Sequence, residues 1–403
     1  MKVLLSAFQC SPDRGSEPGN GWHWATALAQ YGHEVTVLTC SDFREPILAA
    51  GTSGIEFCFI DLPGSRLYRM SPRWGQYGVY RRWQAEAFAQ AADRAGQYDV
   101  AHHVTWASLR LGSMLWQLPV PLVYGPIGGG QAAPRRYWRY FGRNWPAEAL
   151  RNVSGGPQLR LNSRSRGTIR NAAVTLVVNS ATAAAAVRLG GSDVRYMLAD
   201  ALPEDSIAPA RQRPAGTPVV LWAGRLESHK APGLAVEAFA ELRRTTPARL
   251  VIAGDGPLRD DVRALAERLG VAADVDLLGQ VPFAELRRLY DEASVFLFTS
   301  LRETFGSPFL EALGRGLPAV ALDHHGIGDV AVGSAAIKVA LTSSPRELPA
   351  RLAGALHAVL ADPAWESRSA AAVAWASEQV WPSRAAAATR IYQEIARTRS
   401  PAC

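Results

Sequence analysis

The fold is decided by one stretch of sequence, Val295-Phe296-Leu297-Phe298-Thr299-Ser300-Leu301-Arg302-Glu303-Thr304-Phe305-Gly306-Ser307-Pro308-Phe309-Leu310-Glu311. Its first six residues are apolar until their end, which predicts a short buried strand. Ser307 followed by Pro308 predicts a helix start, with a side-chain cap and then a ring suited to the first helical position. The glycines and the proline of residues 314–318 predict the end of that helix, and residues 319–322 predict the next strand. The stretch therefore indicates a strand–loop–helix–strand unit of an α/β sheet.

Two glutamates of this stretch, Glu303 and Glu311, are candidate binding residues. Glu303 is expected on the loop at the carboxyl end of the strand, and Glu311 about one turn into the helix. Between them, the backbone amides from Thr304 to Ser307 open a helix, and a helix amino end favours an anion such as a phosphate. Carboxylates on either side of a phosphate can accept hydrogen bonds from sugar hydroxyls, so the pattern predicts a nucleotide-sugar site. The alternative is a pair of solvated glutamates near a helix start.

The same residues resemble the Glu-x7-Glu signature of the retaining GT-B glycosyltransferases of family 4. Members have Glu-Gly-Phe-Gly where this chain has Glu303-Thr304-Phe305-Gly306, so Thr304 replaces the first glycine and narrows the backbone freedom there. The helix continues as Glu311-Ala312-Leu313, and the next turn and strand as Gly316-Leu317-Pro318-Ala319-Val320, both similar to the family. The resemblance covers nearly the whole chain. It implies that Glu303 holds hydroxyls of the donor sugar and that Glu311 holds the ribose.

A second motif, Gly224-Arg225-Leu226 followed by Lys230, comes directly after a predicted strand at residues 219–222. Arginine can fork across two phosphate oxygens, and lysine acts as a point charge, so this pair can reach a pyrophosphate. The alternative is a solvated pair of loop cations. The family has a similar motif, and the resemblance implies that Arg225 and Lys230 neutralise the leaving diphosphate. Gly254-Asp255-Gly256-Pro257-Leu258 also resembles a family motif, with Gly254 at the donor, although its role could be that of a tight turn.

The amino-terminal half predicts a second βαβ arrangement. A strand at residues 2–8 is followed by the loop Ser16-Glu17-Pro18-Gly19-Asn20-Gly21, a helix over residues 22–31 and a strand at residues 35–39. The resemblance implies that Gly19, Asn20 and Gly21 close on the donor phosphates from the opposite domain. Further strands are expected at residues 99–104, 121–124 and 174–178.

Two histidines and a glycine run are further candidates in this half. His102 and His103 end a predicted strand, which aims one of them at a cleft. In the family a histidine often contacts the donor at the position of Val104. Either His103 takes that place through a shifted strand end, as a catalytic residue, or the contact is absent and both histidines are core residues. Gly128-Gly129-Gly130 predicts a flexible loop that approaches a sugar closely or simply turns.

Composition and charge restrict the class of protein. With 403 residues, 48% of them hydrophobic and 20% charged, the chain is an ordinary globular protein of two to three domains. No apolar run approaches the ~20 residues of a membrane-spanning helix. The four cysteines (Cys10, Cys40, Cys58 and Cys403) show no paired spacing, which indicates a reducing cytoplasm and no zinc module.

The positive charge is confined to the first part of the chain. Residues 1–170 carry 19 Lys and Arg against 11 Asp and Glu, whereas residues 171–403 carry 24 against 25. Two basic segments, Arg66 to Trp83 and Arg135 to Trp145, interleave arginine with tryptophan and tyrosine. Four interpretations stay open: a lipid-surface patch, an acceptor pocket, a partner interface, or aromatic rings packed inward beneath solvated arginines. Among these residues, Arg135 and Arg136 are candidates for the acceptor side, as are His102 and the glycines from Gly128 to Gly130.

We expect no metal ion at the site. Asp274-Val275-Asp276 matches the Asp-x-Asp metal signature of other transferases, but it lies on a predicted strand where the family has only a strand rim. Asp323-His324-His325 is also rejected, because ligands so close on one loop rarely converge on one ion. Arg225, Lys230 and the helix end can supply the positive charge that a metal would supply.

These observations predict a two-domain α/β protein of the GT-B class, with two Rossmann-like doubly wound domains facing each other across a cleft. The expected domains are residues 1–205, to which a helix at about 378–400 returns, and residues 206–377. The expected function is transfer of a sugar from a nucleotide diphosphate sugar, most often UDP- or GDP-linked, to a small-molecule, saccharide or lipid-linked acceptor. The resemblance implies that the anomeric configuration is retained. No cofactor and no nucleic acid are expected. The expected location is cytoplasmic, with peripheral contact to the inner face of the membrane as an option.

Two alternatives to a glycosyltransferase remain. A nucleotide-sugar 2-epimerase on the same fold would need additional carboxylates for proton transfer, and the sequence identifies none. A non-catalytic nucleotide-sugar binding protein would be expected to lack Glu303 or Lys230, and both are present.

Overall fold

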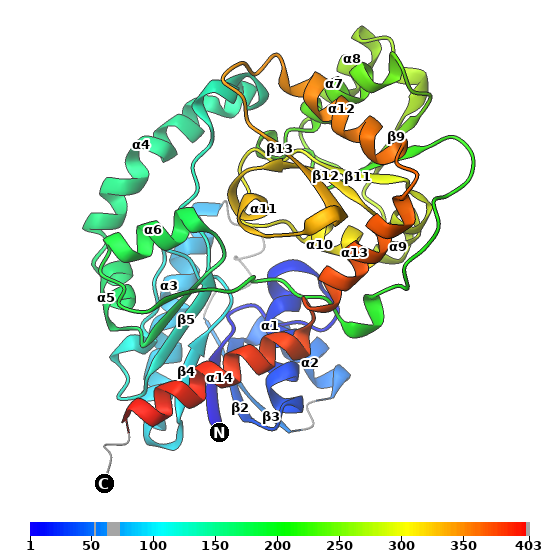
Figure 1. The fold of residues 1–403 in the computed structure, drawn as a ribbon. Coiled ribbons are helices and arrows are strands. Elements are labelled where there is room, and N and C mark those ends of the chain that lie inside the picture. The colour runs from blue at the N-terminus through cyan, green and yellow to red at the C-terminus, as the bar shows by residue number, and fades with distance from the viewer. Residues whose placement is uncertain (52–53, 63–72, 400–403) are drawn as a thin grey trace. The chain divides into compact units, whose positions relative to one another are not determined.

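The computed structural model describes residues 1–51, 54–62 and 73–399, and the chain forms two compact units (Figure 1). Unit 1 consists of residues 1–130, 156–201 and 381–403, and unit 2 of residues 131–155 and 202–380. Part of the predicted basic segment that starts at Arg66, residues 66–72, lies outside the described residues.

Unit 1 contains a parallel sheet of seven strands in the order β3-β2-β1-β4-β5-β6-β7. The order reverses between β1 and β4, which is the arrangement of a doubly wound sheet. Strands β1, β2, β4, β5 and β6 are buried along almost their whole length, as expected for a sheet covered on both faces, whereas the edge strands β3 and β7 are only partly buried. Their bounds are β1 Lys2–Ser6, β2 Glu34–Cys40, β3 Ile55–Ile60, β4 Val100–His103, β5 Leu122–Ile127, β6 Val174–Val177 and β7 Val194–Tyr196.

The helices of unit 1 cover this sheet. α1 and α14 lie side by side, as Figure 1 shows, so a helix distant in sequence completes the N-terminal unit. Trp381 of α14 packs edge-on against Trp24 of α1, and Tyr392 of α14 is fully buried in the core of unit 1. The helices are α1 Ser16–Gln30, α2 Arg44–Ala50, α3 Arg73–Ala92, α5 Ser163–Asn171, α6 Ser180–Arg188 and α14 Trp381–Arg399, and α4 Trp145–Leu161 begins in unit 2 and ends in unit 1.

Unit 2 repeats the architecture with six parallel strands in the order β10-β9-β8-β11-β12-β13. The strand order reverses between β8 and β11. The prediction of two doubly wound α/β domains is therefore confirmed. The strands are β8 Val219–Ala223, β9 Arg249–Ala253, β10 Val275–Gly279, β11 Val295–Phe298, β12 Ala319–Asp323 and β13 Ala336–Ala340.

Helices cover both faces of the second sheet (Figure 1). α7 contacts both α8 and α12, while α10 contacts α13. Pro232 opens α7 and Pro349 lies in the first turn of α12, positions where the missing N–H of proline is not needed. The helices are α7 Pro232–Arg243, α8 Arg259–Arg268, α9 Phe283–Glu292, α10 Ser307–Gly314, α11 His325–Asp329, α12 Leu348–Leu360 and α13 Trp365–Ser377.

The segment 131–155 belongs to unit 2, although the sequence analysis placed it in the N-terminal domain. Ala133, Tyr137 and Phe141 of this segment are buried in the hydrophobic core of unit 2. The hydroxyl of Tyr137 also accepts a hydrogen bond of 2.8 Å from the backbone amide of Thr342. Burial of these rings holds the segment on unit 2, and the sequence shows only that they alternate with arginines.

The first turns of α1 contain the residues that were expected to form a loop. Helix α1 begins at Ser16, so Gly19, Asn20 and Gly21 are helical. A β-carbon on Gly19 would overlap the carbonyl oxygen of Arg14, and one on Gly21 would overlap that of Gln9. Glycine at these two positions therefore allows the first turns of α1 to pack closely against the chain that precedes the helix.

The expected linker, residues 208–218, has no regular secondary structure but is bonded to unit 2. The guanidinium of Arg211 donates hydrogen bonds to the carbonyl oxygens of Tyr290, Asp291 and Ala293, at 2.9, 2.7 and 3.0 Å. These carbonyls lie at the end of α9, where a cation is favourable. Burial lowers the pKa of Arg211 to about 10. This segment is thus held on unit 2 by two arginines, since Arg213 also donates to the carbonyl oxygen of Leu360 at 2.7 Å.

Candidate functional site

The candidate site lies in unit 2, at the carboxyl ends of the neighbouring strands β8 and β11. These strands flank the point at which the strand order reverses, and this is where doubly wound sheets bind ligands. The loops that follow them are bonded to each other: the amides of Leu301 and Arg302 donate to the carbonyl oxygen of His229, at 2.8 and 3.2 Å. The Thr299 hydroxyl donates to the carbonyl oxygen of Lys230 at 3.0 Å. The structure therefore brings the two predicted motifs together.

Lys230 and Glu303, predicted from separate motifs, form an ion pair. The Nζ of Lys230 donates to Oε2 of Glu303, and the two side chains are only 17% and 19% exposed. The other carboxylate oxygen, Oε1, accepts a hydrogen bond of 3.1 Å from the backbone amide of Thr304. Because water screens this pair only in part, each charge is effective on whatever lies beside it.

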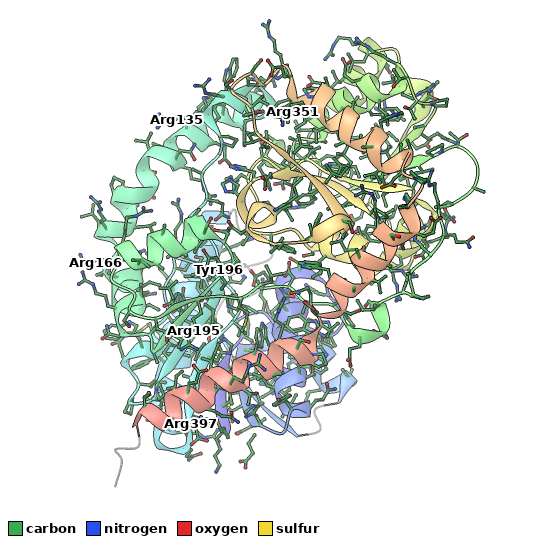
Figure 2. All side chains as sticks on the ribbon, viewed as in Figure 1. Arg135, Arg166, Arg195, Tyr196, Arg351 and Arg397 are labelled. Carbon is green, nitrogen blue, oxygen red and sulfur yellow. The ribbon has the colours of Figure 1, made fainter. Side chains whose placement is uncertain are left out.

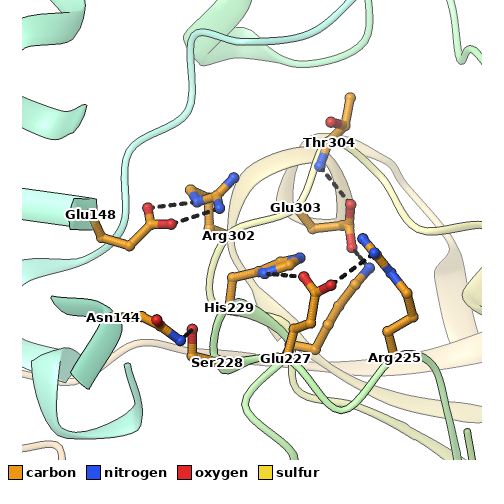
Figure 3. A network of polar contacts seen from close by, with 10 residues as sticks. Asn144, Glu148, Arg225, Glu227, Ser228, His229, Arg302, Glu303 and Thr304 are labelled. Atoms are coloured by element: carbon orange, nitrogen blue, oxygen red, sulfur yellow. Dashed lines mark hydrogen bonds and ion pairs between the residues drawn. The ribbon is translucent and has the colours of Figure 1, made fainter. Parts of the chain in front are cut away.

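Arg225 belongs to a second ion pair beside the first. Its Nη1 lies 2.7 Å from Oε1 of Glu227, whose Oε2 lies 3.3 Å from Nδ1 of His229 (Figure 3). The Arg225 side chain is 65% exposed, so its guanidinium can turn toward a ligand at small cost. Glu227 was not predicted, because it lies one residue beyond the Gly224-Arg225-Leu226 motif and has no spacing signal of its own.

The loop of Glu303 leads into α10 through Gly306. This glycine caps the helix with φ of +114°, and a β-carbon on it would overlap the ring of Phe298. Ser307 was predicted to cap the helix with its side chain, but it is the first helical residue and Gly306 holds the cap position. The correction follows from packing, since only glycine fits between the ring and the helix. Phe305, next to it, is buried.

Glu311 lies on α10 as predicted, on the turn that follows the helix start. Its Oε2 accepts a hydrogen bond of 2.9 Å from the hydroxyl of Tyr290. Burial, with the nearby Glu311 carboxylate as a second cause, raises the pKa of Tyr290 well above its ordinary value. The hydroxyl therefore keeps its proton and acts as a donor to Glu311. Tyr290 was not identified from the sequence.

The loops after β8 and β9 pack backbone against backbone. A β-carbon on Gly254 would overlap the carbonyl oxygen of Gly224, and the amide of Gly224 donates to the carbonyl oxygen of Ala253 at 3.0 Å. The amide of Leu226 likewise donates to the carbonyl oxygen of Asp255 at 2.9 Å. Gly254 therefore permits the close approach of the two loops, and Gly224 supplies the positive φ of +152° that the Arg225 loop needs.

Segment 131–155 contacts four residues around the site, and none of these contacts was predicted. Each contact joins one residue of the segment to one residue next to, or within, the two loops. They are the hydrogen bonds Gln131 Nε2 to Thr304 Oγ1 (3.1 Å), His325 Nε2 with Ala132 O (3.1 Å) and Asn144 Nδ2 to Ser228 Oγ (3.2 Å), and the ion pair of Arg302 with Glu148 (2.8 Å). The sequence carries no signal for them, because the partners are 84 to 193 residues apart along the chain.

The two histidines of unit 1 are buried in its core. His102 contacts the hydroxyl of Tyr392 at 2.6 Å and the carbonyl oxygen of Gly125 at 2.8 Å. His103 contacts the hydroxyls of Ser113 and Tyr80, both at 2.8 Å. Burial lowers the pKa of His102 to about 4 and that of His103 to about 3, so both rings are neutral near pH 7. These contacts favour the core interpretation, and a catalytic role for His103 stays a prediction.

Of the glycine run at residues 128–130, Gly130 permits close packing. A β-carbon on Gly130 would lie 2.5 Å from the Cα of Thr182 in α6, and the Gly130 amide donates to the Thr182 hydroxyl at 3.2 Å. Gly129 has φ of +111°, and Gly128 forms an isolated bridge with Ser108. Donor contact by Gly19, Asn20 and Gly21, like acceptor contact by Gly128 to Gly130, stays a prediction.

The two arginines predicted on the acceptor side, Arg135 and Arg136, lie in unit 2. Figure 2 labels the first of them, Arg135. Arg135 is exposed, and Nη1 of Arg136 donates to the carbonyl oxygen of Ser343 at 3.1 Å. Arg139 pairs with Glu237 of α7 at 2.8 Å. The prediction that this basic segment belongs to the N-terminal domain is therefore wrong, because its buried rings are part of the core of unit 2.

The Asp274-Val275-Asp276 motif, which was rejected as a metal site, forms ion pairs away from the candidate site. Asp274 pairs with Arg243 at 2.8 Å and Asp276 with Arg249 at 2.7 Å, near the start of β10 and thus at the sheet edge opposite the site. Among the described residues, no group of three or more His, Cys, Asp or Glu could hold a metal ion. A hollow of about 540 Å³ in unit 2 is also separate from the site; its lining includes Arg139, Glu237, Arg243, Asp274 and Arg346.

No helix in the described part of the chain is long and apolar enough to cross a membrane.

Comparison with solved structures shows the GT-B fold. Sucrose-phosphate synthase from Thermosynechococcus elongatus superposes with a TM-score of 0.67 at 18% identity, covering 98% of this chain and 99% of the other. Anabaena HepE in complex with UDP superposes with a TM-score of 0.62 at 17% identity, covering 99% of both chains.

Sequence comparison agrees with the fold. Residues 204–372, which contain all the unit 2 candidates except the 131–155 segment, match the family described as glycosyl transferases group 1. The chain is 27% identical to glycogen synthase of Mycobacterium tuberculosis, over 97% of this chain and 94% of that protein. It is 33% identical to D-inositol 3-phosphate glycosyltransferase of Streptomyces bingchenggensis, over 48% of this chain and 45% of that protein. The chain therefore has the GT-B fold, and its residues 204–372 are similar to the glycosyl transferases group 1 family.

Proposed function

We propose that this glycosyltransferase transfers a sugar from a nucleotide diphosphate sugar to an acceptor hydroxyl with retention of the anomeric configuration. The observation that carries the proposal is the ion pair between Lys230 and Glu303 at the switch point of the second sheet. It places a cation and a carboxylate side by side, as a ligand with a diphosphate and sugar hydroxyls requires. Relatives of this chain include a glycogen synthase, and a structural neighbour was solved with UDP.

Each donor group has a candidate partner in unit 2. Lys230 and Arg225 take the diphosphate, assisted by the backbone amides at the start of α10. Glu303 accepts hydrogen bonds from the sugar hydroxyls, and Glu311, supported by Tyr290, accepts them from the ribose. The same arrangement explains why Glu303 is held from both sides, by Lys230 and by the Thr304 amide.

In the proposed reaction the bond between the anomeric carbon and the diphosphate oxygen breaks, and the acceptor oxygen bonds to that carbon on the same face. The acceptor proton passes to the departing phosphate oxygen. Arg225 and Lys230 stabilise the negative charge that develops on the diphosphate, which lowers the barrier without an enzymic nucleophile. We propose that no metal or cofactor takes part.

The acceptor is proposed to be a small molecule, a saccharide or a lipid-linked sugar. We further propose that the enzyme acts in the cytoplasm, with peripheral contact to the inner face of a membrane if the acceptor is lipid-linked. The matches to glycosyltransferases do not favour an epimerase.

The test begins with a thermal-shift screen of UDP- and GDP-sugars, because a donor that binds only the folded protein raises its melting temperature. The stabilising donor is then incubated with candidate acceptors, and the anomeric configuration of the product is determined by NMR. Product of inverted configuration would refute retention. A changed sugar released without any acceptor would identify an epimerase, and stabilisation with no turnover on any acceptor would identify a binding protein.

A further inference from the structure

We propose that Glu148 is a positioning residue for the donor site: it holds Arg302, and through it the loop of Glu303, in the geometry that meets Lys230. The effect on catalysis rests on the proposed function. The contact itself is independent of that function. Glu148 lies in segment 131–155 and is outside the residues that match the glycosyltransferase family.

The contact between Glu148 and Arg302 is bidentate and nearly buried. Nε and Nη2 of Arg302 donate to the two carboxylate oxygens of Glu148, each at 2.8 Å. The side chains are 15% and 14% exposed, less than those of Lys230 and Glu303. A forked arginine–carboxylate pair fixes orientation as well as distance, unlike a single hydrogen bond. Arg302 cannot rotate without leaving a buried charge unpaired, which is costly.

Arg302 immediately precedes Glu303, so the position of Arg302 sets the start of the loop that contains Glu303. Its amide also donates to the carbonyl oxygen of His229, the residue before Lys230. Without Glu148, the guanidinium of Arg302 would be free to approach the Glu303 carboxylate and to compete with Lys230 for it. Glu148 therefore both aligns the loop and removes a competing cation.

A second contact of the same segment holds the other loop. Asn144 Nδ2 donates to Ser228 Oγ at 3.2 Å, and Ser228 lies in the short 3₁₀ turn that carries Lys230 (Figure 3). Asn144 and Glu148 flank the start of helix α4, and Glu148 lies in its first turn, where an acidic residue is favourable. One helix start thus braces the loops of both charged donor residues.

The variant Glu148→Gln tests the proposal, because it keeps the size of the side chain and removes its charge. We expect kcat to fall about 100-fold, the order of loss that a shift of about 1 Å at the reacting groups produces. The KM for the donor should change by less, since Arg225 and Glu311 keep their contacts. The double variant Glu148→Gln with Arg302→Gln should lose no more than the worse single variant, because both act through one contact.

The matched control is Asp362→Asn. Asp362 pairs with Arg368, both side chains are 19% exposed, and the pair follows the end of α12, at the sheet edge opposite the site. Its loss should cost comparable stability and leave kcat unchanged. A folded Glu148→Gln protein with kcat within threefold of the wild type would overturn the proposal, as would an equal loss of kcat in Asp362→Asn.

Hydrogen exchange separates this proposal from the proposed function. In Glu148→Gln, but not in Asp362→Asn, the amides of residues 299–306 should exchange about tenfold faster or more. If the wild type transfers no sugar from any nucleotide donor, the proposed function fails, and the exchange result alone decides whether Glu148 positions the loop. Unchanged hydrogen exchange in Glu148→Gln would then refute the proposal that Glu148 positions the Glu303 loop.

Discussion

Replacing Lys230 by alanine removes the cation closest to Glu303 and should separate catalysis from stability. Its side chain is only 17% exposed, so its charge is poorly screened and acts strongly on a neighbouring diphosphate. Loss of one donor that stabilises developing charge costs ~3 kcal/mol of barrier, or about 150-fold in kcat. Folding should lose about 1 to 2 kcal/mol, between the values of exposed and buried pairs, because the Thr304 amide still satisfies one oxygen of Glu303.

Arg225→Ala provides the contrast within the same site. Arg225 is 65% exposed, so its removal should cost under about 1 kcal/mol of stability while lowering kcat by a similar factor to Lys230→Ala. Arg249→Ala is the control, since Arg249 begins β9 at the opposite edge of the sheet and should leave kcat unchanged. Release of nucleoside diphosphate gives kcat, and urea unfolding gives stability. A folded Lys230→Ala protein with near-normal turnover would show that the diphosphate does not bind at Lys230.

Three further outcomes are expected. The double variant Asp274→Ala and Asp276→Ala should stay active, also in EDTA; loss of activity on chelation that magnesium or manganese restores would show a metal requirement. The free energy of unfolding should fall on acidification from pH 7 to 5. The pKa of His102 and His103 is near 6.5 in the unfolded chain but about 4 and 3 in the folded protein. The unfolded chain therefore binds protons first, which lowers the free energy of unfolding by about 2 kcal/mol for each histidine at pH 5. Urea unfolding of an asparagine variant at either position should show a weaker pH dependence, and an unchanged slope contradicts this assignment. Gly306→Ala should destabilise by ~1 to 3 kcal/mol, since its φ of +114° and the adjacent ring leave no room for a methyl group; a neutral effect in urea unfolding would contradict it.

Much of the fold is predictable because its strands are continuous apolar runs between turn signals. The strand before Glu303, the helix after it and the next strand all appear within a residue or two of the predicted bounds. Three strands were missed, Ile55–Ile60, Val194–Tyr196 and Ala336–Ala340. The first contains Glu56, whose carboxylate pairs with Arg94 at 2.7 Å. Such a partner is invisible to a local pattern.

The candidate site was predictable where its chemistry is local in sequence. Lys230 and Glu303 each follow a strand, and parallel strands bring their carboxyl ends to one edge. Tyr290, Glu148 and Gln131 could not be predicted, since each reaches the site through tertiary packing. Their contacts with Glu311, Arg302 and Thr304 depend on where whole elements lie.

The exchange of segments between the units bears on the order in which the chain can fold during synthesis. Unit 1 needs α14, whose Trp381, Ile391 and Tyr392 complete its core, so its first 130 residues must wait for the ribosome to reach residue 399. Unit 2, by contrast, has all its segments once residue 380 has been made. We therefore expect the second unit to reach its native state before the first, the reverse of the amino-to-carboxyl order common in multidomain proteins. Until then His102 lacks its Tyr392 partner.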